Sequence, residues 1–300
     1  MSVMSFPDRG PWGNSRYRGN CSGYFYQQLF TQLNAKSFCD PMIGSGTSIE
    51  VAKEMGLESV HGLDLHSGFN AIRDSILSAI GGLPVDLCFS HPPYHTVLPY
   101  SGPGGMWGTD QAPHIDDLSA CPNVDDFYDK MVLVLVNQRE ATKAGGHYGT
   151  LIADQRKNGQ YHSFQAELIA RMPRDELKAV LIKLQHNTMS GLKTYSRMKY
   201  PCIEHEYAIL WQKPERGIYL LPVMAKQAYD RVKSAWKVIV RSALMMLGGK
   251  ASLKEIYAYV SNSHPDRVDA NPNYEAKIRQ VLQLTEWFDS SERGVWQLAA

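Results

Sequence analysis

Short apolar runs alternate with segments of helical periodicity over the first 215 or so residues, and this alternation constrains the fold most strongly. The apolar runs end near residues 39, 65, 90, 153, 185 and 212, and the third of them is a predicted strand at residues 86–90. Most stretches between the runs repeat apolar side chains every three or four residues, which predicts helices that include residues 70–80, 124–143 and 161–172, with a break at Gly145-Gly146. Residues 96–126 are rich in Gly, Pro, Ser and Asp without a period, and we predict an active-site loop there. Strands that alternate with amphipathic helices form a sheet covered by helices. We therefore predict an α/β domain over residues 1–222.

The pattern changes after a linker around residues 219–226. Helical segments follow at residues 229–247, 253–262 and 274–284, and short apolar runs at 287–288 and 295–298 then flank a turn. Helices followed by a hairpin in this order predict a winged helix-turn-helix-like module. We assign residues 223–300 to this module and expect it to contact DNA or to mediate assembly, for example as a homodimer.

Charge and cysteine content exclude several classes of protein. Lys and Arg number 31 against 30 Asp and Glu, so no global field attracts nucleic acid and any such surface must be local. The five cysteines include no CxxC pair, and the acids between residues 110 and 126 lack calcium-loop spacing, so we expect no disulfide framework and no metal. The polar N-terminus and the lack of a long apolar run predict a cytoplasmic protein without a membrane partner.

A glycine-rich turn, DPMIGSGT at residues 40–47, lies between a predicted strand and a predicted helix. Small residues let the backbone approach a ligand, and a helix N-terminus presents free N–H groups. The turn lacks the Gly-Lys-Ser/Thr ending of a phosphate-binding Walker loop, which disfavours phosphoryl transfer. The alternatives are a purely structural turn and a turn that binds another nucleotide. The candidate cofactor-binding residues here are Asp40, Pro41, Gly44, Ser45, Gly46 and Thr47.

A second acidic residue follows at the spacing of a ribose-binding carboxylate. Asp64 ends the next predicted strand about 20 residues after the turn, where doubly wound folds use an acid to bind the two ribose hydroxyls. The alternative is a solvated acid after a strand. The turn and Asp64 together predict an adenosine-bearing cofactor.

The segment Ser90-His91-Pro92-Pro93-Tyr94 closes the third predicted strand. A proline pair fixes the backbone and directs a carbonyl outward, and the tyrosine supplies a stacking face beside it. With the DPxxGSGT turn, this segment resembles the DNA amino-methyltransferases, whose hallmark is Asp, Asn or Ser followed by Pro-Pro and an aromatic residue. The resemblance covers roughly residues 14–214, with the cofactor loop before the catalytic motif, as in the gamma-type order.

This resemblance implies a Rossmann-like class I methyltransferase sheet and S-adenosylmethionine as cofactor. Asn20 and Tyr24 fall in a segment that resembles the family's cofactor-contacting region, and residues 204–207 resemble its closing strand. The implied reaction is N6-methylation of a flipped-out adenine in double-stranded DNA, with cytosine N4 as the alternative target. Such an enzyme belongs to a restriction-modification system or acts as an orphan methylase in a bacterium or phage.

The implied chemistry needs two acceptors for the hydrogens of the target amino group. By resemblance these are the residue before the prolines and the Pro92 carbonyl, while Tyr94 stacks on the base. The sequence departs from the family because His91 stands where Asp, Asn or Ser is usual. A neutral imidazole offers one acceptor nitrogen, so with an ordinary pKa near 6.5 we expect activity to decline below about that pH. Ser90 is the alternative acceptor, and the usual guide to adenine or cytosine does not apply.

Two basic segments are candidate DNA contacts, with an ordinary solvated surface as the alternative for each. Residues 187–200 carry Lys193, Tyr195, Arg197 and Lys199, and the last predicted helix carries Lys277, Arg279 and Gln280. Two other functions compete with DNA methylation. One is methylation of RNA or of a protein amide, and the other is DNA binding without catalysis by a vestigial cofactor fold.

Overall fold

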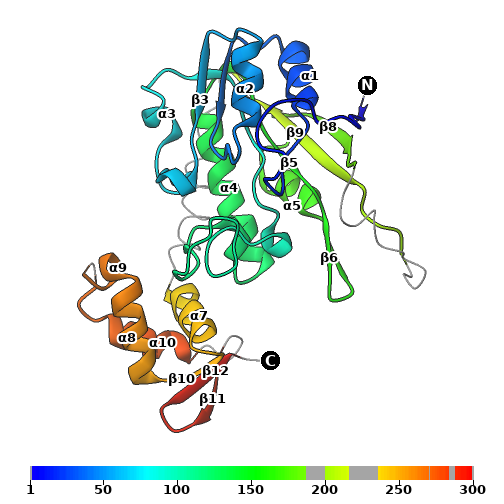
Figure 1. The fold of residues 1–300 in the computed structure, drawn as a ribbon. Coiled ribbons are helices and arrows are strands. Elements are labelled where there is room, and N and C mark those ends of the chain that lie inside the picture. The colour runs from blue at the N-terminus through cyan, green and yellow to red at the C-terminus, as the bar shows by residue number, and fades with distance from the viewer. Residues whose placement is uncertain (1, 187–199, 216–235, 270, 284–287, 299–300) are drawn as a thin grey trace.

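A seven-stranded sheet forms the centre of the computed structural model, which describes residues 2–186, 200–215, 236–269, 271–283 and 288–298 (Figure 1). The strand order is β1-β8-β9-β5-β4-β2-β3. Strand β9 is antiparallel to both of its neighbours, and the other pairings in this sheet are parallel. The strands are β1 (Val3–Met4), β2 (Ser37–Asp40), β3 (Ser59–Gly62), β4 (Val85–Ser90), β5 (Thr142–Ile152), β8 (Leu177–Leu184) and β9 (His205–Gln212).

Helices cover both faces of this sheet, which confirms the predicted α/β fold class. Helices α1 (Gly23–Leu33) and α2 (Thr47–Glu54) pack on one face, and α4 (Val124–Glu140) and α5 (Phe164–Arg171) pack on the other. Strand side chains alternate between the two cores, because successive residues of a strand point to opposite faces. In β9, for example, Ala208 and Leu210 join the α1–α2 core, whereas Ile209 and Trp211 join the α4–α5 core.

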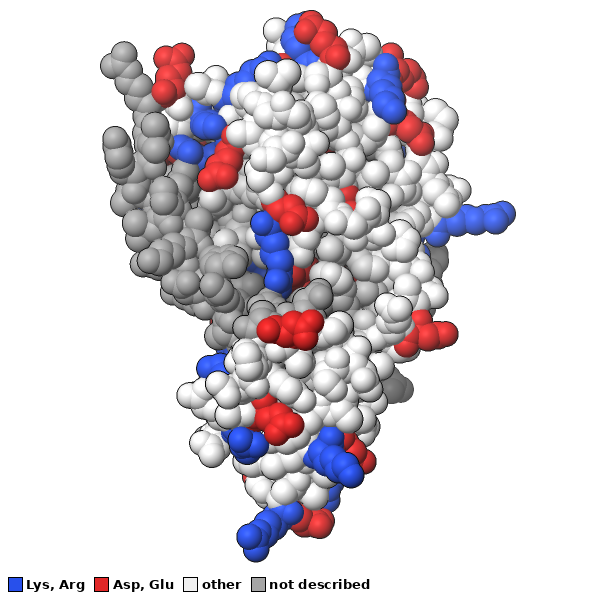
Figure 2. Space-filling model, turned by 90° about the vertical axis from the view of Figure 1, so that its left-hand side faces the viewer, with Lys and Arg blue, Asp and Glu red and all other residues white. Residues whose placement is uncertain are grey.

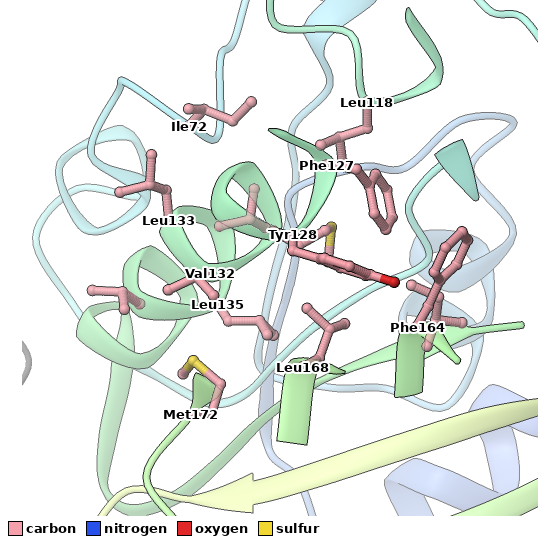
Figure 3. Close-up of a cluster of buried hydrophobic side chains, with 14 of the residues drawn as sticks. Ile72, Leu118, Phe127, Tyr128, Val132, Leu133, Leu135, Phe164, Leu168 and Met172 are labelled. Carbon is pink, nitrogen blue, oxygen red and sulfur yellow. The ribbon is translucent and has the colours of Figure 1, made fainter. Parts of the chain in front are cut away.

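The α4–α5 core is rich in aromatic rings (Figure 3). Phe127 and Phe164 are fully buried, with their ring centroids 4.9 Å apart, and Leu135 and Leu168 fill the space beside them. Burying a large apolar side chain contributes roughly 1.5–3 kcal/mol. This packing fixes α4, and with it the loop that precedes α4 at residues 98–123.

The strand order creates a switch point between β2 and β4. The chain leaves β2 for β3 on one side and returns to pair β4 on the other side of β2. Loops that leave the carboxyl ends of two such strands diverge, and ligands of doubly wound sheets bind in the resulting crevice. The two predicted motifs follow β2 and β4 directly.

Two predicted helices differ from the structure. The helix predicted at residues 70–80 is reduced to α3 (Ile76–Ala79), because the Asn137 side chain donates to the carbonyls of Ala71 and Asp74 and accepts from the Ile76 N–H. The helix predicted from residue 161 begins only at Phe164. A hairpin of β6 (Gln155–Lys157) and β7 (Gln160–His162) precedes it and projects from the domain (Figure 1).

The C-terminal elements enclose a hydrophobic core of their own. Ile239, Leu244, Ile256 and Ile278 are buried there, and Ile115 of the loop before α4 packs against it. The assignment of a winged helix and its boundary at residue 222 stay predictions. The elements are α7 (Trp236–Met246), α8 (Leu253–Ser263), α9 (Pro265–Asp269) and α10 (Tyr274–Leu282), with an antiparallel sheet of β10 (Lys250–Ser252), β12 (Val295–Leu298) and β11 (Phe288–Glu292).

Acidic and basic side chains lie interspersed over the face that Figure 2 presents. Among the described residues, no helix combines the length and apolar character that crossing a membrane requires. The same residues contain no group of three or more His, Cys, Asp or Glu side chains arranged to hold a metal ion.

Candidate active site

An open cavity lies at the switch point of the sheet. Residues of the glycine turn line it beside Asp64 at the end of β3, and His91 and Pro93 enter from the end of β4. The structure therefore brings most of the predicted cofactor-binding residues together with two of the five predicted catalytic residues, His91 and Pro93. The predicted residues that line the cavity are Asn20, Asp40, Pro41, Gly44, Ser45, Thr47, Asp64, His91 and Pro93.

The glycine turn depends on backbone conformations that favour glycine. Gly44 has φ of 49° and Gly46 has φ of 87°, both in the left-handed region, and Gly46 immediately precedes α2. The Asp64 carboxylate binds the turn, since it accepts the N–H of Gly44 at 3.0 Å and that of His66 at 2.9 Å. Asp64 thus faces the cavity and orders the turn at the same time.

Asp40 presents a buried carboxyl group to the cavity. Its exposed fraction is 2%, and it accepts hydrogen bonds from the Ser48 hydroxyl at 2.6 Å and the Met42 N–H at 2.9 Å. No described Lys or Arg forms an ion pair with it. Burial raises the pKa of Asp40 to about 7, although both hydrogen bonds oppose the shift. A cationic ligand group beside this carboxyl would favour its ionised form.

The cavity lining is acidic. Asp40, Asp64, Asp116 and Asp117 all contribute to it, and the described residues that line it include no Lys or Arg. Arg73 and Asn70 bind Asp116 and, against the opposing effect of burial, lower the pKa of its carboxyl. A cavity of this composition suits a cation and disfavours a polyphosphate.

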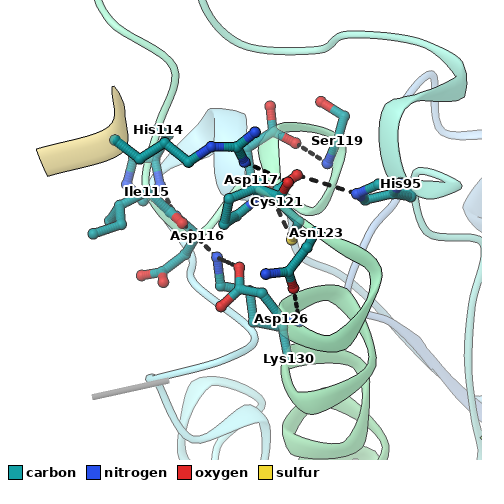
Figure 4. A network of polar contacts seen from close by, with 12 residues as sticks. His95, His114, Ile115, Asp116, Asp117, Ser119, Cys121, Asn123, Asp126 and Lys130 are labelled. Atoms are coloured by element: carbon teal, nitrogen blue, oxygen red, sulfur yellow. Dashed lines mark hydrogen bonds and ion pairs between the residues drawn. The ribbon is translucent and has the colours of Figure 1, made fainter. Parts of the chain in front are cut away.

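Asp116 and Asp117 come from the long loop before α4, which polar contacts tie to the domain (Figure 4). The Asp117 carboxylate accepts the N–H groups of Ser101 and Ser119, both at 2.8 Å. Lys130 of α4 donates to the Ile115 carbonyl at 2.7 Å. Sequence reasoning predicted this loop as part of the active site but missed these two acids as lining residues, because only the fold directs them into the cavity.

Aromatic rings that sequence reasoning also missed line the cavity. Trp107 stacks on His66 with ring centroids 5.0 Å apart, and Tyr17 and Tyr100 lie 6.2 Å apart. Tyr17, Tyr100 and Trp107 all contact the cavity, and burial raises the pKa of Tyr17 to about 12. Flat apolar faces beside carboxylates suit a ligand with an aromatic ring and polar edges.

His91 belongs to a chain of short polar contacts behind the cavity. Its Nε2 lies 2.5 Å from the Tyr94 hydroxyl, which donates to Glu206 Oε1 at 2.6 Å. Lys183 donates to Glu206 Oε2, also at 2.6 Å. Burial lowers the pKa of His91 to about 4, which outweighs the opposite effect of Glu206. The expectation of an ordinary histidine pKa near 6.5 is therefore wrong, because the ring is desolvated.

Comparisons with known proteins show only distant likeness. No family model matches the chain, and no curated protein matches it. Among solved structures, TrmN from Thermus thermophilus is 16% identical over 66% of this chain and 51% of its own, with a TM-score of 0.39. A candidate DNA modification methylase from the same species, complexed with S-adenosyl-L-methionine, is 18% identical over 50% of this chain and 55% of its own, with a TM-score of 0.31.

An rRNA methylase from Streptococcus thermophilus is 10% identical over 64% of this chain and 96% of its own, with a TM-score of 0.34. The chain spans about half the length of TrmN and of the Thermus DNA modification methylase.

The structure directs several predicted site residues away from the cavity. The Ser90 hydroxyl is fully buried and points to Gln138 and Thr150, each at 3.4 Å. Tyr24 packs edge-on against Trp12, with ring centroids 5.2 Å apart, and the cavity is lined instead by Tyr26. Gly46, Pro92 and Tyr94 also do not line the cavity, although each adjoins a residue that does.

The predicted DNA contacts are only partly visible. Lys193, Tyr195, Arg197 and Lys199 lie outside the described residues. On α10, Arg279 donates to the Tyr257 hydroxyl at 2.9 Å and Lys277 to the Gln280 side chain at 2.9 Å, and Arg279 and Gln280 are exposed. These contacts order the side chains of α10 at the surface of the C-terminal elements.

Proposed function

We propose that this chain is an S-adenosylmethionine-dependent DNA methyltransferase that methylates an exocyclic amino group, adenine N6 first and cytosine N4 as the alternative. The observation that carries this proposal is the acidic cavity that follows the glycine turn. Its lining holds four aspartates and, within the described residues, no Lys or Arg. A sulfonium and an ammonium group suit this lining, whereas the phosphates of a nucleotide or dinucleotide cofactor would be repelled.

The residues present fit S-adenosylmethionine. Asp40 would hold a cationic group, and Asp64 would accept the ribose hydroxyls. Asp116 or Asp117 would accept the adenine amino group, with Trp107 beside the ring. When bound, the cofactor supplies a methyl group already activated on a positively charged sulfur. The chain then has to hold the target amino group in line with that methyl group and accept its hydrogens.

His91 is the side chain that lines the cavity where the target amino group would enter. Its depressed pKa keeps the ring neutral at physiological pH, as a hydrogen-bond acceptor requires. The Pro92 carbonyl would be the second acceptor. We also propose that the Tyr94 ring stacks on the target base. The Tyr94 hydroxyl itself donates a hydrogen bond to Glu206.

A surface next to the catalytic turn favours nucleic acid as the substrate. On the β6–β7 hairpin, the Arg156 guanidinium lies 5.6 Å from the Tyr161 ring centroid and 5.3 Å from that of Tyr200. The two rings are about half exposed, and Lys157 donates to Thr96 Oγ1 at 2.7 Å, just after the motif. Basic side chains interleaved with exposed aromatic rings suit phosphate contact and base stacking.

Methyl transfer to defined substrates tests the proposal. The protein is incubated with methyl-labelled S-adenosylmethionine and double-stranded DNA, which is then digested to nucleosides for mass analysis. We expect N6-methyladenine, and N4-methylcytosine would assign the alternative target. Label in RNA or protein but not in DNA would overturn the DNA assignment. DNA binding without any transfer would instead favour a non-enzymatic DNA-binding protein.

We predict that cofactor affinity decreases as the pH falls below about 7. Burial raises the pKa of Asp40 to about 7, so binding a cation below that pH requires the loss of a proton. Affinity should fall by up to about tenfold per pH unit between about pH 7 and 5.5. Calorimetry in two buffers of different ionisation enthalpy measures the proton released. Asp40→Asn should bind more weakly and without this pH dependence, whereas a pH-independent wild type would contradict the prediction.

We also propose that the C-terminal elements contact DNA through α10. Reversing two charges with Lys277→Glu and Arg279→Glu should reduce DNA affinity at least about tenfold and lower the salt slope by roughly 2. Cofactor affinity should stay unchanged. The control is the double variant Lys36→Glu and Lys53→Glu, which makes the same charge change at exposed residues just before β2 and on α2. In Figure 1, α2 lies far from α10. If both double variants lost DNA affinity equally, the loss would be due to net charge, and a specific contact of α10 with DNA would be rejected.

A further inference from the structure

The polar chain behind His91 fixes where its hydrogens lie. Lys183 of β8 and Glu206 of β9 are directly opposed partners in the sheet, and their side chains are 9% and 7% exposed. Glu206 receives one hydrogen bond from Lys183 and one from the Tyr94 hydroxyl, each at 2.6 Å. Burial alone would raise the pKa of Glu206, but Lys183, His91 and these hydrogen bonds outweigh it and lower the pKa to about 2.

An ionised Glu206 can only accept hydrogen bonds, so the single hydrogen of the Tyr94 hydroxyl points to Glu206. The same hydroxyl oxygen lies 2.5 Å from His91 Nε2. With its own hydrogen already used, the hydroxyl can only accept a hydrogen bond from that nitrogen. Nε2 must therefore carry the ring proton, and because the ring is neutral, Nδ1 carries the lone pair.

Nδ1 has no hydrogen-bond partner among the described residues. His91 lines the cavity, while its Nε2 edge faces Tyr94 and Glu206, which lies 3.7 Å away. The charged and titratable groups around the ring are Glu206, Lys183 and Tyr94, with Cys21 close enough to Lys183 and Glu206 to interact with both. Nδ1 is thus the nitrogen left for a ligand.

We propose that Lys183, Glu206 and Tyr94 are positioning residues that hold His91 in its Nε2–H tautomer, so that Nδ1 accepts a hydrogen from the target amino group. The catalytic part of this proposal rests on the proposed methyltransferase function. The tautomer itself does not depend on that function, because it follows from the hydrogen bonds among an ionised Glu206, the Tyr94 hydroxyl and a neutral His91 ring. The Nε2–H tautomer of His91 provides a neutral acceptor at the position where the resembling family has Asp, Asn or Ser. The need to hold this tautomer also explains why Lys183 and Glu206 are paired in the sheet behind the motif.

The ring tautomer can be measured without substrate. Two-dimensional ¹⁵N–¹H NMR of protein labelled in its histidine rings distinguishes a protonated ring nitrogen from an unprotonated one. The His91 signals are assigned by their loss in His91→Asn. We expect Nε2 protonated and Nδ1 bare at neutral pH. A His91 protonated on Nδ1 in the wild-type protein would overturn the proposal.

Glu206→Gln provides the decisive variant, because it keeps the shape of the side chain. The amide oxygen can still accept from Lys183, but the amide nitrogen donates to the Tyr94 oxygen. The Tyr94 hydrogen then points to His91 Nε2 and moves the ring proton to Nδ1. We expect that tautomer shift and a loss of at least about 100-fold in methyl-transfer rate, with cofactor affinity retained.

Tyr94→Phe removes the link between Glu206 and His91 and should leave the two tautomers mixed.

Two further outcomes separate this proposal from the proposed function. If Glu206→Gln folds, as circular dichroism and cofactor binding report, and keeps both tautomer and rate, the positioning role is wrong. If the wild-type tautomer is as expected but no nucleic acid is methylated, the methyltransferase assignment and its catalytic use of Nδ1 fail, whereas the tautomer assignment stands.

Discussion

Replacing His91 with alanine is expected to slow single-turnover methyl transfer about 100-fold or more, the usual loss when one preorganised hydrogen-bonding partner is removed from a transition state. Cofactor affinity should change little, because the four aspartates of the cavity remain. His91→Asn should retain most of the rate, since the amide oxygen is also an acceptor. Ser90→Ala is the matched comparison at the neighbouring position. If Ser90→Ala loses the rate and His91→Ala keeps it, the roles of the two residues are reversed.

The acid limit of the same reaction should lie near pH 4. Burial and Lys183 lower the pKa of His91 to about 4, against the opposing effect of Glu206, so the ring stays an acceptor at pH 5 to 6. The rate constant at saturating cofactor should be flat there and fall only near pH 4. The unfolded chain takes up this proton near about pH 6.5, so stability also decreases as the pH falls from there towards 4. Circular dichroism must therefore verify the fold at each pH.

The largest loss of stability is expected when one partner of the buried Arg139–Glu176 pair is removed. Arg139 donates to both carboxylate oxygens of Glu176 at 2.7 Å, and the Tyr148 hydroxyl donates to the same carboxylate at 2.6 Å. These residues are at most 6% exposed. Arg139→Met would leave Glu176 buried without its cation, which costs roughly 3–5 kcal/mol. Chemical denaturation followed by circular dichroism measures the loss.

A double variant provides the control for this stability prediction. Arg139→Met with Glu176→Leu removes both charges, and two apolar side chains of similar volume should recover much of the lost stability. Lys250→Ala breaks an ion pair with Glu292 whose side chains are 48% and 70% exposed, and should cost at most about 1 kcal/mol. If the single variant Arg139→Met were no less stable than Lys250→Ala, other groups or water would be stabilising the Glu176 carboxylate, and the prediction would be wrong.

The alternation of strands and helices predicted the α/β architecture because it depends on local periodicity. The strand at residues 86–90 and the helix from residue 124 correspond to β4 and α4 within a few residues. Contacts distant in sequence decided the exceptions. Asn137 prevents a full helix at residues 70–80, and the break predicted at Gly145 and Gly146 is an interruption of the pairing inside β5, between the residues opposite Val85 and Leu87.

The sequence predicted those residues of the candidate site that directly follow or end a strand. Asp40, Asp64 and His91 stand at such ends and meet in one cavity. Asp116 and Trp107 were not predictable, because the sequence of a loop without periodicity does not indicate which of its side chains face the cavity. The pKa of His91 was also out of reach, because it depends on burial beside Lys183 and Glu206, which are about 90 to 115 residues away in sequence.

The cross-strand pairing of Lys183 with Glu206 separates the support of His91 from the connection between the two strands. Both residues belong to strands whose register is fixed by main-chain pairing from Leu184↔His205 to Leu177↔Trp211. The intervening residues, 185–204, include the predicted contact residues Lys193 and Arg197 and connect two ends that are already joined. Lengthening or exchanging such a connection costs little loop-closure entropy and leaves the register intact. Under the proposed function, exchanging residues between the two strands would alter the contacts to DNA and leave His91, Lys183 and Glu206 in place.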